Sequence, residues 1–209
     1  MTELVFVHLD AGQRLAFPEE TIEHVYFPRD AVISMLVSMG DGKTVESAAV
    51  GNEGIVGLEV FLGSGIALEE KLVQISGEAA RMTATLFRLA VGRSAALQDV
   101  LQRFALGLMN QIARNAGCNR VHTVEERCAR MLLMSRDQTG SDDFSLTHEF
   151  LAKMLGVRRA SVSQAAENLQ RADLIRYRQG RIHILDGDGL ENAACEDYRL
   201  TRAVYDRLY

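Results

Sequence analysis

Residues 145–169 read SLTHEFLAKMLGVRRASVSQAAENL. Two short amphipathic helices that meet across a tight turn need a small residue where they cross, a glycine in the turn and apolar residues on their facing sides. Ala152 has the required size, Gly156 lies at the turn, and Val162 and Ala165 follow at the spacing that points the second helix at the first. The stretch therefore predicts a helix-turn-helix. The alternative is a helical hairpin that matches these positions by accident.

The outward face of the second predicted helix carries side chains suited to nucleic acid. When its apolar residues turn inward, Arg159 and Gln164 lie on the opposite face. A guanidinium pairs with guanine O6 and N7, and an amide pairs with adenine, so we predict that these two residues read bases. Thr147 is predicted to cap the first helix and to contact DNA. The other predicted DNA contacts, which would bind phosphates, are Arg158, Ser161 and Ser163. For each arginine alone, a solvated surface charge is the alternative.

A β-hairpin is predicted directly behind this helix. Two β-prone runs, IRY and RIHIL, flank Arg178, Gln179 and Gly180, and the glycine favours a tight turn. A hairpin in this place is a wing, and its Arg178 and Arg181 would reach flanking phosphates. A plain hairpin with surface arginines is the alternative.

The distribution of charge supports this interpretation, although the 209-residue chain has a net charge of −5. Residues 1–118 carry the whole excess of acid, and residues 119–209 are neutral. Within the latter, residues 153–181 hold seven basic and two acidic side chains, a local charge of +5. A compact basic patch attracts a phosphate backbone whatever the total charge. The acidic total therefore does not exclude DNA binding.

The first ninety or so residues are predicted to be β-rich. Short apolar runs (HVYFP, AVISMLVSM, TVESAAV and KLVQI) recur at roughly ten-residue spacing. Turn signals separate them, at Pro28–Arg29–Asp30, Gly40–Asp41–Gly42, Gly51–Asn52 and Gly63–Ser64–Gly65. This spacing favours an antiparallel barrel or roll over alternating strands and helices.

Residues 94–118 are predicted to form one long helix. Its apolar seam steps by four and three, through Leu97, Leu101, Phe104 and Leu108. The same register next meets Gln111 and Asn115. We interpret the seam as the contact of a two-stranded dimer helix whose polar positions set the register. Packing of the helix on its own domain is the alternative. A further helix is predicted at about residues 124–136.

The three cysteines, Cys118, Cys128 and Cys195, are far apart in the sequence and form no CxxC motif. We expect three free thiols, no metal site and a reducing, cytoplasmic setting. No apolar run reaches the length of about 18 residues that a membrane helix needs, and the first residues lack a signal-peptide layout. A membrane partner is therefore not expected.

Taken together, these elements resemble the Crp/Fnr family of bacterial transcription regulators. The resemblance is carried by CNRVHTVEERCARMLLMSRD, LTHEFLAKMLGVRRASVS and GRIHILD, and by FPRDAVIS and GNEGIVGLEVFLG in the first half. It implies an α+β fold with an N-terminal antiparallel β-roll of cupin-like, cyclic-nucleotide-binding-like type at residues 1–93. A dimerisation helix at 94–118 and a C-terminal winged helix-turn-helix DNA-binding domain at 119–209 would follow. It also implies a homodimer on a pseudo-palindromic site in double-stranded DNA and contact with RNA polymerase.

The predicted recognition helix departs from well-known members of that family. Arg159 matches the arginine that meets guanine, but Ala160 replaces a glutamate that accepts from cytosine, and Gln164 replaces a base-reading arginine. Glu167 stands where a phosphate-facing lysine can occur. The DNA sequence bound by those members therefore cannot be transferred to this chain.

The first half departs further. Family members that bind cyclic nucleotides use a glycine–glutamate turn for the ribose and an arginine–serine pair for the phosphate. Here Glu59 is present, but no arginine occurs from Asn52 to Ala80, and Lys71 is the one cation. We therefore expect that cyclic AMP is not bound. Iron–sulfur sensing needs N-terminal cysteines, which are absent, and haem ligation by His8 or His24 is a weak alternative.

The sequence thus predicts a sequence-specific, DNA-binding transcription regulator without a cofactor and with an unidentified effector. The alternative is a ligand-sensing module that acts through protein contacts and binds DNA weakly. No nucleophile–base pair, metal-ligand spacing or phosphate-binding loop favours an enzyme.

Overall fold

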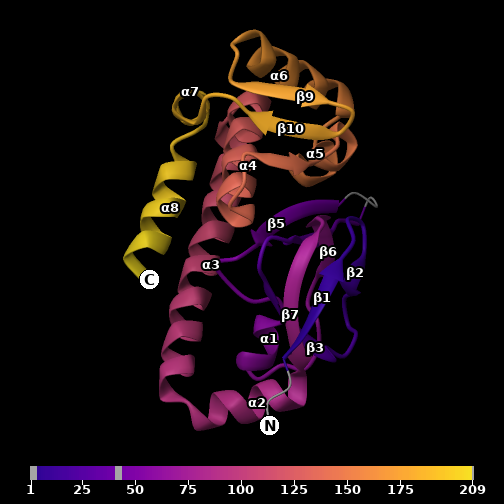
Figure 1. Cartoon of the computed structure of the whole chain (residues 1–209), viewed down its shortest axis with the longest axis vertical. Coiled ribbons are helices and arrows are strands. Elements are labelled where there is room, and N and C mark those ends of the chain that lie inside the picture. The colour runs from indigo at the N-terminus through magenta and orange to yellow at the C-terminus, as the bar shows by residue number, and fades with distance from the viewer. Residues whose placement is uncertain (1–3, 41–43, 209) are drawn as a thin grey trace.

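The computed structural model describes residues 4–40 and 44–208. It places a β-roll beside a long helix, with a smaller mixed domain stacked at one end of both (Figure 1). The predicted turn at Gly40–Asp41–Gly42 lies partly outside the described residues. No helix within residues 4–40 and 44–208 is both long and apolar enough to cross a bilayer.

The N-terminal roll consists of two antiparallel sheets among the described residues. One has the order β1-β7-β3 and the other the order β2-β6-β4-β5. The strands are β1 (Val5–Leu9), β2 (Arg14–Ala16), β3 (His24–Pro28), β4 (Val32–Ser38), β5 (Thr44–Val50), β6 (Glu70–Ile75) and β7 (Gly77–Thr83). Each apolar run identified in the sequence forms a strand, and every pairing is antiparallel. The predicted β-roll and the α+β class are confirmed.

Two helices lie inside the part of the chain that was expected to be β-rich. Helix α1 (Leu58–Phe61) follows the turn at Gly57, and α2 (Ala84–Arg93) follows β7 directly. The β-rich segment is confirmed in its strands, and α2 is an element that the sequence analysis did not identify. Its capping residue, Thr83, accepts a hydrogen bond from the Leu86 N–H at 3.3 Å, a start signal that the strand pattern concealed.

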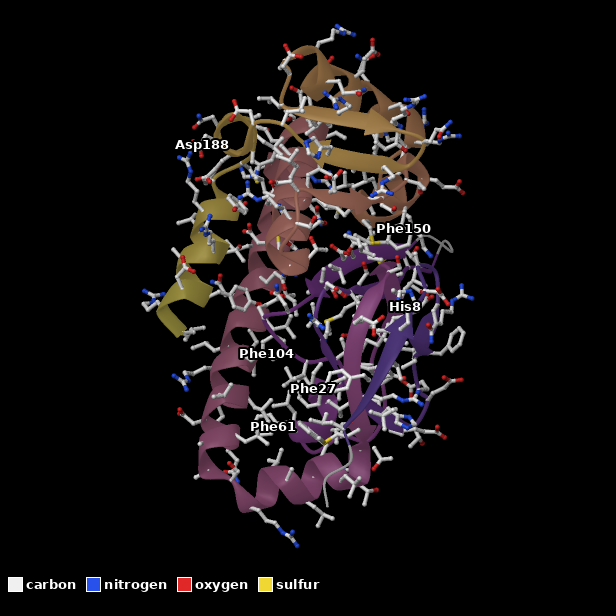
Figure 2. The ribbon with its side chains drawn as sticks, viewed as in Figure 1. His8, Phe27, Phe61, Phe104, Phe150 and Asp188 are labelled. Carbon is white, nitrogen blue, oxygen red and sulfur yellow. The ribbon has the colours of Figure 1, made fainter. Side chains whose placement is uncertain are left out.

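The long helix α3 (Ala95–Val121) packs on its own roll through the seam that was interpreted as a dimer contact. Phe104 points from α3 toward the roll (Figure 2), and its ring lies against Gly54. Gln111 donates to the Ala49 carbonyl at 3.2 Å, and Asn115 donates to the Ser47 carbonyl at 2.8 Å. The predicted dimer seam is therefore wrong. Its polar residues donate hydrogen bonds to backbone carbonyls of strand β5 in the same chain rather than pairing with a second helix.

Helix α4 (Val124–Thr139) begins with a capping box, in which Thr123 and Glu126 bond each other's backbone N–H. One hydrophobic core continues from the outer face of the β2-β6-β4-β5 sheet into this helix and into the C-terminal domain. Leu36 and Leu72 of the sheet share it with Leu132 of α4 and Leu151 of the helix that follows. The division into domains at residues 93 and 118 stays a prediction, because this core crosses it.

The C-terminal part contains the helix-turn-helix, the wing and two further helices. Its elements are β8 (Asp143–Ser145), α5 (His148–Leu155), α6 (Arg159–Arg171), β9 (Ile175–Arg178), β10 (Arg181–Ile184), α7 (Gly187–Ala193) and α8 (Asp197–Leu208). Helix α8 runs back along α3 (Figure 1). This return brings Cys195 to Cys118, with 3.4 Å between the sulfur atoms. All three cysteines are free thiols, as expected. Cys118 and Cys195 also belong to a group of side chains that could hold a metal ion, which the sequence did not indicate.

A buried carboxyl group lies where the roll meets α4. The Ser34 hydroxyl donates to Glu46 at 2.6 Å, and the charge of the nearby Arg130 guanidinium of α4 acts to lower the pKa of Glu46. Burial nevertheless raises the pKa of Glu46 to about 7. A carboxyl whose pKa is higher in the folded state than in the unfolded state reduces stability as the pH rises from about 4.5 to about 7, because the folded state then holds the extra proton.

Replacing Glu46 by glutamine is therefore expected to stabilise the protein at pH 8, by up to about 3 kcal/mol, and to give no gain below about pH 4.5. Urea unfolding at the two pH values measures the difference. Glu23→Gln, at an exposed position of the same roll, is the control and should change neither value. A gain of equal size at both pH values would contradict the assignment.

Candidate nucleic-acid interface

The helix-turn-helix is built as its sequence pattern predicts. Thr147 caps α5 by accepting from the Phe150 N–H at 3.2 Å. Gly156 ends the helix with a φ of 63°, in the left-handed region that a side chain disfavours. On α6 the inward residues Val162, Ala165, Ala166 and Leu169 are all buried. These contacts fix the direction in which α6 presents its opposite face.

Arg158 and Arg159 lie at the beginning of α6 and are exposed. Arg158 is the N-cap residue, and its guanidinium, which has no acceptor atom, makes no capping bond. Ala160, beside them, is also exposed. Two cations at a helix N-terminus are unfavourable to the helix dipole. Their position therefore does not stabilise the isolated helix.

The other predicted contacts on α6 are partly engaged within the domain. The Gln164 amide donates to Asn168 at 3.1 Å, and Asn168 in turn donates to Glu125 of α4 at 2.6 Å. Ser163 is 3.1 Å from the His148 ring. Ser161 lines a shallow groove between α6 and the beginning of α4 together with Gln164. Gln164 is exposed, so its amide can exchange Asn168 for another partner. Ser163, by contrast, connects α6 to α5 through His148.

The wing is a tight hairpin that follows α6 and lies between α6 and α5 in Figure 1. Strands β9 and β10 pair Arg178 with Arg181, and the two residues between them have positive φ, 51° for Gln179 and 79° for Gly180. This is the turn geometry that favours glycine and suits the twist of a hairpin. Strand β8 pairs with the other edge of β10. The predicted hairpin is confirmed in its strands and in its turn.

Two features of the wing were not identified from the sequence as site features. Arg176 shares one face of the hairpin with Arg178 and Arg181, because β9 alternates and β10 pairs in register with it. The Tyr177 ring stacks on His148 with 3.9 Å between ring centroids, which ties the wing to α5. The alternation of Arg176 and Arg178 in IRYR was the available signal for the first, whereas the stacking depends on tertiary contact.

Five arginines of α6 and the wing form no ion pair within the described part of the chain. Across residues 4–40 and 44–208, no carboxylate forms an ion pair with Arg158, Arg159, Arg176, Arg178 or Arg181. By contrast, Arg171 at the end of α6 is paired with Glu167 at 2.7 Å. The unpaired arginines lie on α6 and the wing, whereas the charge of Arg171 between them is neutralised by Glu167. The fold and this surface together define a winged helix-turn-helix protein with an N-terminal β-roll.

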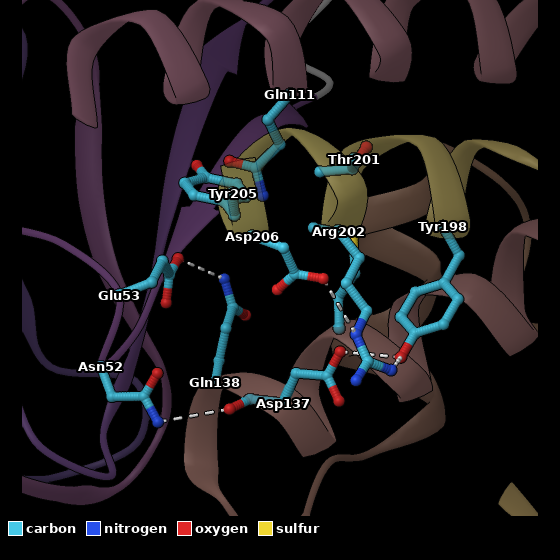
Figure 3. Close-up of a pocket in the computed structure, with 11 residues that line it drawn as sticks. Asn52, Glu53, Gln111, Asp137, Gln138, Tyr198, Thr201, Arg202, Tyr205 and Asp206 are labelled. Carbon is cyan, nitrogen blue, oxygen red and sulfur yellow. Dashed lines mark hydrogen bonds and ion pairs between the residues drawn. The ribbon is translucent and has the colours of Figure 1, made fainter. Parts of the chain in front are cut away.

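A cavity of about 320 Å³ lies where the roll, α3, α4 and α8 meet (Figure 3). Its polar side chains bond across that junction. Gln138 of α4 donates to Glu53 at 2.9 Å, and Asn52 donates to the Asp137 carbonyl at 3.2 Å. Burial raises the pKa of Glu53. These hydrogen bonds join the roll to α4, so the cavity lies at the junction between the roll and the C-terminal part of the chain.

Comparison with known proteins agrees with this architecture. Residues 126–193 match the family model of the Crp-like helix-turn-helix domain. No curated protein matches the sequence. The structure of FixK2 from Bradyrhizobium japonicum is similar, with a TM-score of 0.77 and 16% identity over 92% of this chain and 98% of that one.

Two further solved structures show the same arrangement. A CRP-family transcriptional regulator from Thermus thermophilus has a TM-score of 0.73 and 18% identity over 90% of this chain and 96% of that one. The c-di-GMP responsive regulator CLP of Xanthomonas campestris has a TM-score of 0.65 and 14% identity, over 87% and 93%. The chain thus carries a Crp-like helix-turn-helix domain within the Crp/Fnr fold, and the resemblance seen in its sequence is confirmed.

Proposed function

We propose that the protein is a transcription regulator of the Crp/Fnr type that binds double-stranded DNA through α6 and the wing. The observation that carries this proposal is the set of exposed arginines without ion-pair partners on these two elements, described above. Unpaired cations clustered on one surface release counterions from DNA when they meet its phosphates. The sequence-specific part of the proposal rests on α6, whose first turn would enter the major groove.

Within this proposal, Arg159 reads a guanine and Gln164 reads an adenine after releasing Asn168. Arg158, Ser161, Arg178 and Arg181 hold phosphates, and Arg176 joins them on the wing. Thr147 lies against the wing turn, since its methyl group is within 3.3 Å of the position that a side chain on Gly180 would take. Its hydroxyl oxygen is used as a cap, so its backbone N–H or the free side of the hydroxyl would face a phosphate.

The test begins with selection of bound sequences from a random DNA pool, because the site is not known. For the selected site, Arg159→Ala is expected to weaken binding by about 1–3 kcal/mol and to relax the preference at one base pair. Arg158→Ala is expected to weaken binding to all sequences and to reduce the slope of log affinity against log salt by about 1. Fluorescence anisotropy across a salt series measures both effects.

The double variant Glu167→Gln with Arg171→Gln is the matched control, because it removes an exposed ion pair from the same helix without changing the net charge. It should leave affinity and salt slope close to the wild-type values. If binding shows no salt dependence and survives Arg158→Ala combined with Arg159→Ala, the DNA proposal is wrong. The alternative of a ligand-sensing module that acts through protein contacts would then be favoured.

We also propose that the protein acts as a homodimer through α3, on the face opposite the buried seam. Leu106 and Met109 on that face are 57% and 67% exposed, and Ala116 continues the stripe. The steps between them suit a two-stranded contact. Two copies of α6 in such a dimer would meet half-sites about one helical turn apart on a pseudo-palindromic site. Contact with RNA polymerase is proposed from the resemblance alone.

The roll is proposed to sense something other than cyclic AMP. Glu59, the residue that matches the ribose-binding glutamate, pairs with Lys71 at 2.8 Å, and Lys71 also pairs with Glu69 at 2.7 Å. Both carboxylates and the ammonium group are shielded from solvent. Lys71, the one cation of residues 52–80, is therefore already bound by two anions, which supports the proposal.

A further inference from the structure

Four side chains with metal-binding atoms converge where α3 ends and α8 begins. Cys118 and His122 lie four residues apart, so they share one side of the helix end. Cys195 and Asp197 come from the residues that enter α8. One sulfur, nitrogen or oxygen atom from each lies within 4.8 Å of the corresponding atom of every other member. We call these four residues the Cys–His–Asp cluster.

The spacing inside the cluster is close to that of a tetrahedral zinc site. Zinc bonds of about 2.3 Å to sulfur and about 2.0–2.2 Å to nitrogen or oxygen place two sulfur ligands about 3.8 Å apart, and a nitrogen and an oxygen about 3.4 Å apart. Here the Cys118 and Cys195 sulfur atoms are 3.4 Å apart. His122 Nδ1 and Asp197 Oδ2 are also 3.4 Å apart. These two pairs are thus within a few tenths of an ångström of the separations that coordination requires.

The groups around the cluster orient its ligands. His122 Nε2 is 3.2 Å from a Glu196 carboxylate oxygen, so the ring can turn Nδ1 toward the cluster. A carboxylate on the outer nitrogen of a histidine is the usual support of a zinc ligand. Arg114 lies 3.4 Å from the other Asp197 oxygen, Oδ1, and leaves Oδ2 directed inward. The cluster therefore has both the ligands and the outer partners of a metal site.

Burial and charge also suit a metal ion. Cys118, Cys195 and Asp197 are 0%, 4% and 6% exposed. Thiolates rather than thiols bind metals. A divalent cation would balance most of the negative charge that two thiolates and a carboxylate bring together.

We propose that Cys118, His122, Cys195 and Asp197 bind one zinc ion in a closed, tetrahedral structural site. The proposal is independent of the DNA-binding function, because no ligand belongs to α6 or the wing. The site would join α8 to the end of α3, and His122 is followed directly by Thr123, the cap of α4. Zinc would therefore fix the turn between the helix on the roll and the helix that leads to the DNA-binding domain.

A disulfide between Cys118 and Cys195 is the competing use of the two sulfur atoms. It would employ neither His122 nor Asp197, nor the carboxylate that supports the histidine. The convergence of nitrogen, oxygen and sulfur ligands with their outer partners favours the metal. The experiment below separates the two.

The test is titration of the reduced, metal-free full-length protein with cobalt(II), a spectroscopic substitute for zinc. We expect one equivalent to produce a thiolate-to-cobalt charge-transfer band and the intense visible absorption of a tetrahedral ion, and zinc to remove both. Cys118→Ser and Cys195→Ser should abolish the charge-transfer band or weaken it severely. Cys128→Ser is the matched control, since Cys128 is a buried thiol of α4 outside the cluster, and it should keep the full signal.

A milder variant guards against loss of folding. Glu196→Gln retains all four ligands and the exposed surface of residue 196, and should lower cobalt affinity about 10–100-fold without changing the shape of the spectrum. Zinc should also raise the unfolding temperature of the wild type but not of Cys195→Ser. Absence of a charge-transfer band in the reduced wild type would overturn the proposal. So would an unchanged band in folded Cys195→Ser, or a Cys118–Cys195 disulfide in a protein whose reduced form binds no metal.

Discussion

Replacing Lys71 by methionine is expected to lower the free energy of unfolding by about 3–5 kcal/mol, the usual cost of breaking a buried ion pair on one side. Lys71 is 1% exposed and lies between Glu59 and Glu69, at 2.8 and 2.7 Å. Methionine keeps most of the side-chain volume and removes the charge, so two carboxylates are left without their cation. Urea unfolding followed by circular dichroism, with the midpoint and slope both fitted, measures the change.

Two further variants test whether the lost stability comes from the broken ion pairs. Lys153→Met removes a partly exposed lysine for which no ion pair is described in residues 4–40 and 44–208, and should change stability by less than about 0.5 kcal/mol. Adding Glu59→Gln to Lys71→Met should recover part of the loss, because it removes one of the stranded charges. If Lys71→Met costs less than about 1 kcal/mol, the ion pairs do not hold the roll together. The proposal that these ion pairs leave Lys71 unable to bind a cyclic phosphate would lose its support as well.

Placing glutamate at both Leu106 and Met109 is expected to convert the dimer to a monomer and to reduce affinity for the selected DNA site by about 1000-fold or more. The reason is that each protomer would then meet one half-site, and binding would approach the non-specific level. Like charges facing each other along a helix pair are strongly unfavourable. Light scattering measures the mass, and anisotropy on the full site and on an isolated half-site measures the affinity.

Val100→Glu is the control for this experiment. Val100 is a 40% exposed apolar residue of the same helix, but it lies about 120° around the axis from Leu106. It should leave the mass and the DNA affinity unchanged. A wild-type protein that is monomeric in solution and on DNA, or a double variant that stays dimeric, would show that α3 is not the dimer contact.

The helix-turn-helix could be predicted from the sequence because its constraints are local. Ala152, Gly156 and Val162 lie within eleven residues, and each has a single steric reason to be the type it is. The strands were predictable for a similar reason, since apolar runs between turn signals leave few other structures. The arginines of α6 could be placed once the inward residues of that helix were identified.

The rest could not be predicted, because it depends on which surfaces meet. An apolar seam such as Leu101, Phe104 and Leu108 has the same spacing whether its partner is a second helix or the roll of its own chain. Only the bonds from Gln111 and Asn115 to β5 distinguish the two. The cluster of Cys118 and Cys195 joins residues 77 positions apart. It forms because α8 returns along α3, and no short-range pattern indicates that return.

The hydrophobic core shared by the sheet, α4 and the helix-turn-helix has a mechanical consequence. Close-packed interiors are nearly incompressible, so a displacement at one side reaches the other with little loss. Leu36 and Leu72 of the roll pack in the same cluster as Leu132 of α4 and Leu151 of α5. A displacement of the strands would therefore be transmitted directly to these helices. The shared core therefore predicts that a change in the roll reaches α5 and α6 through direct packing rather than through a flexible linker.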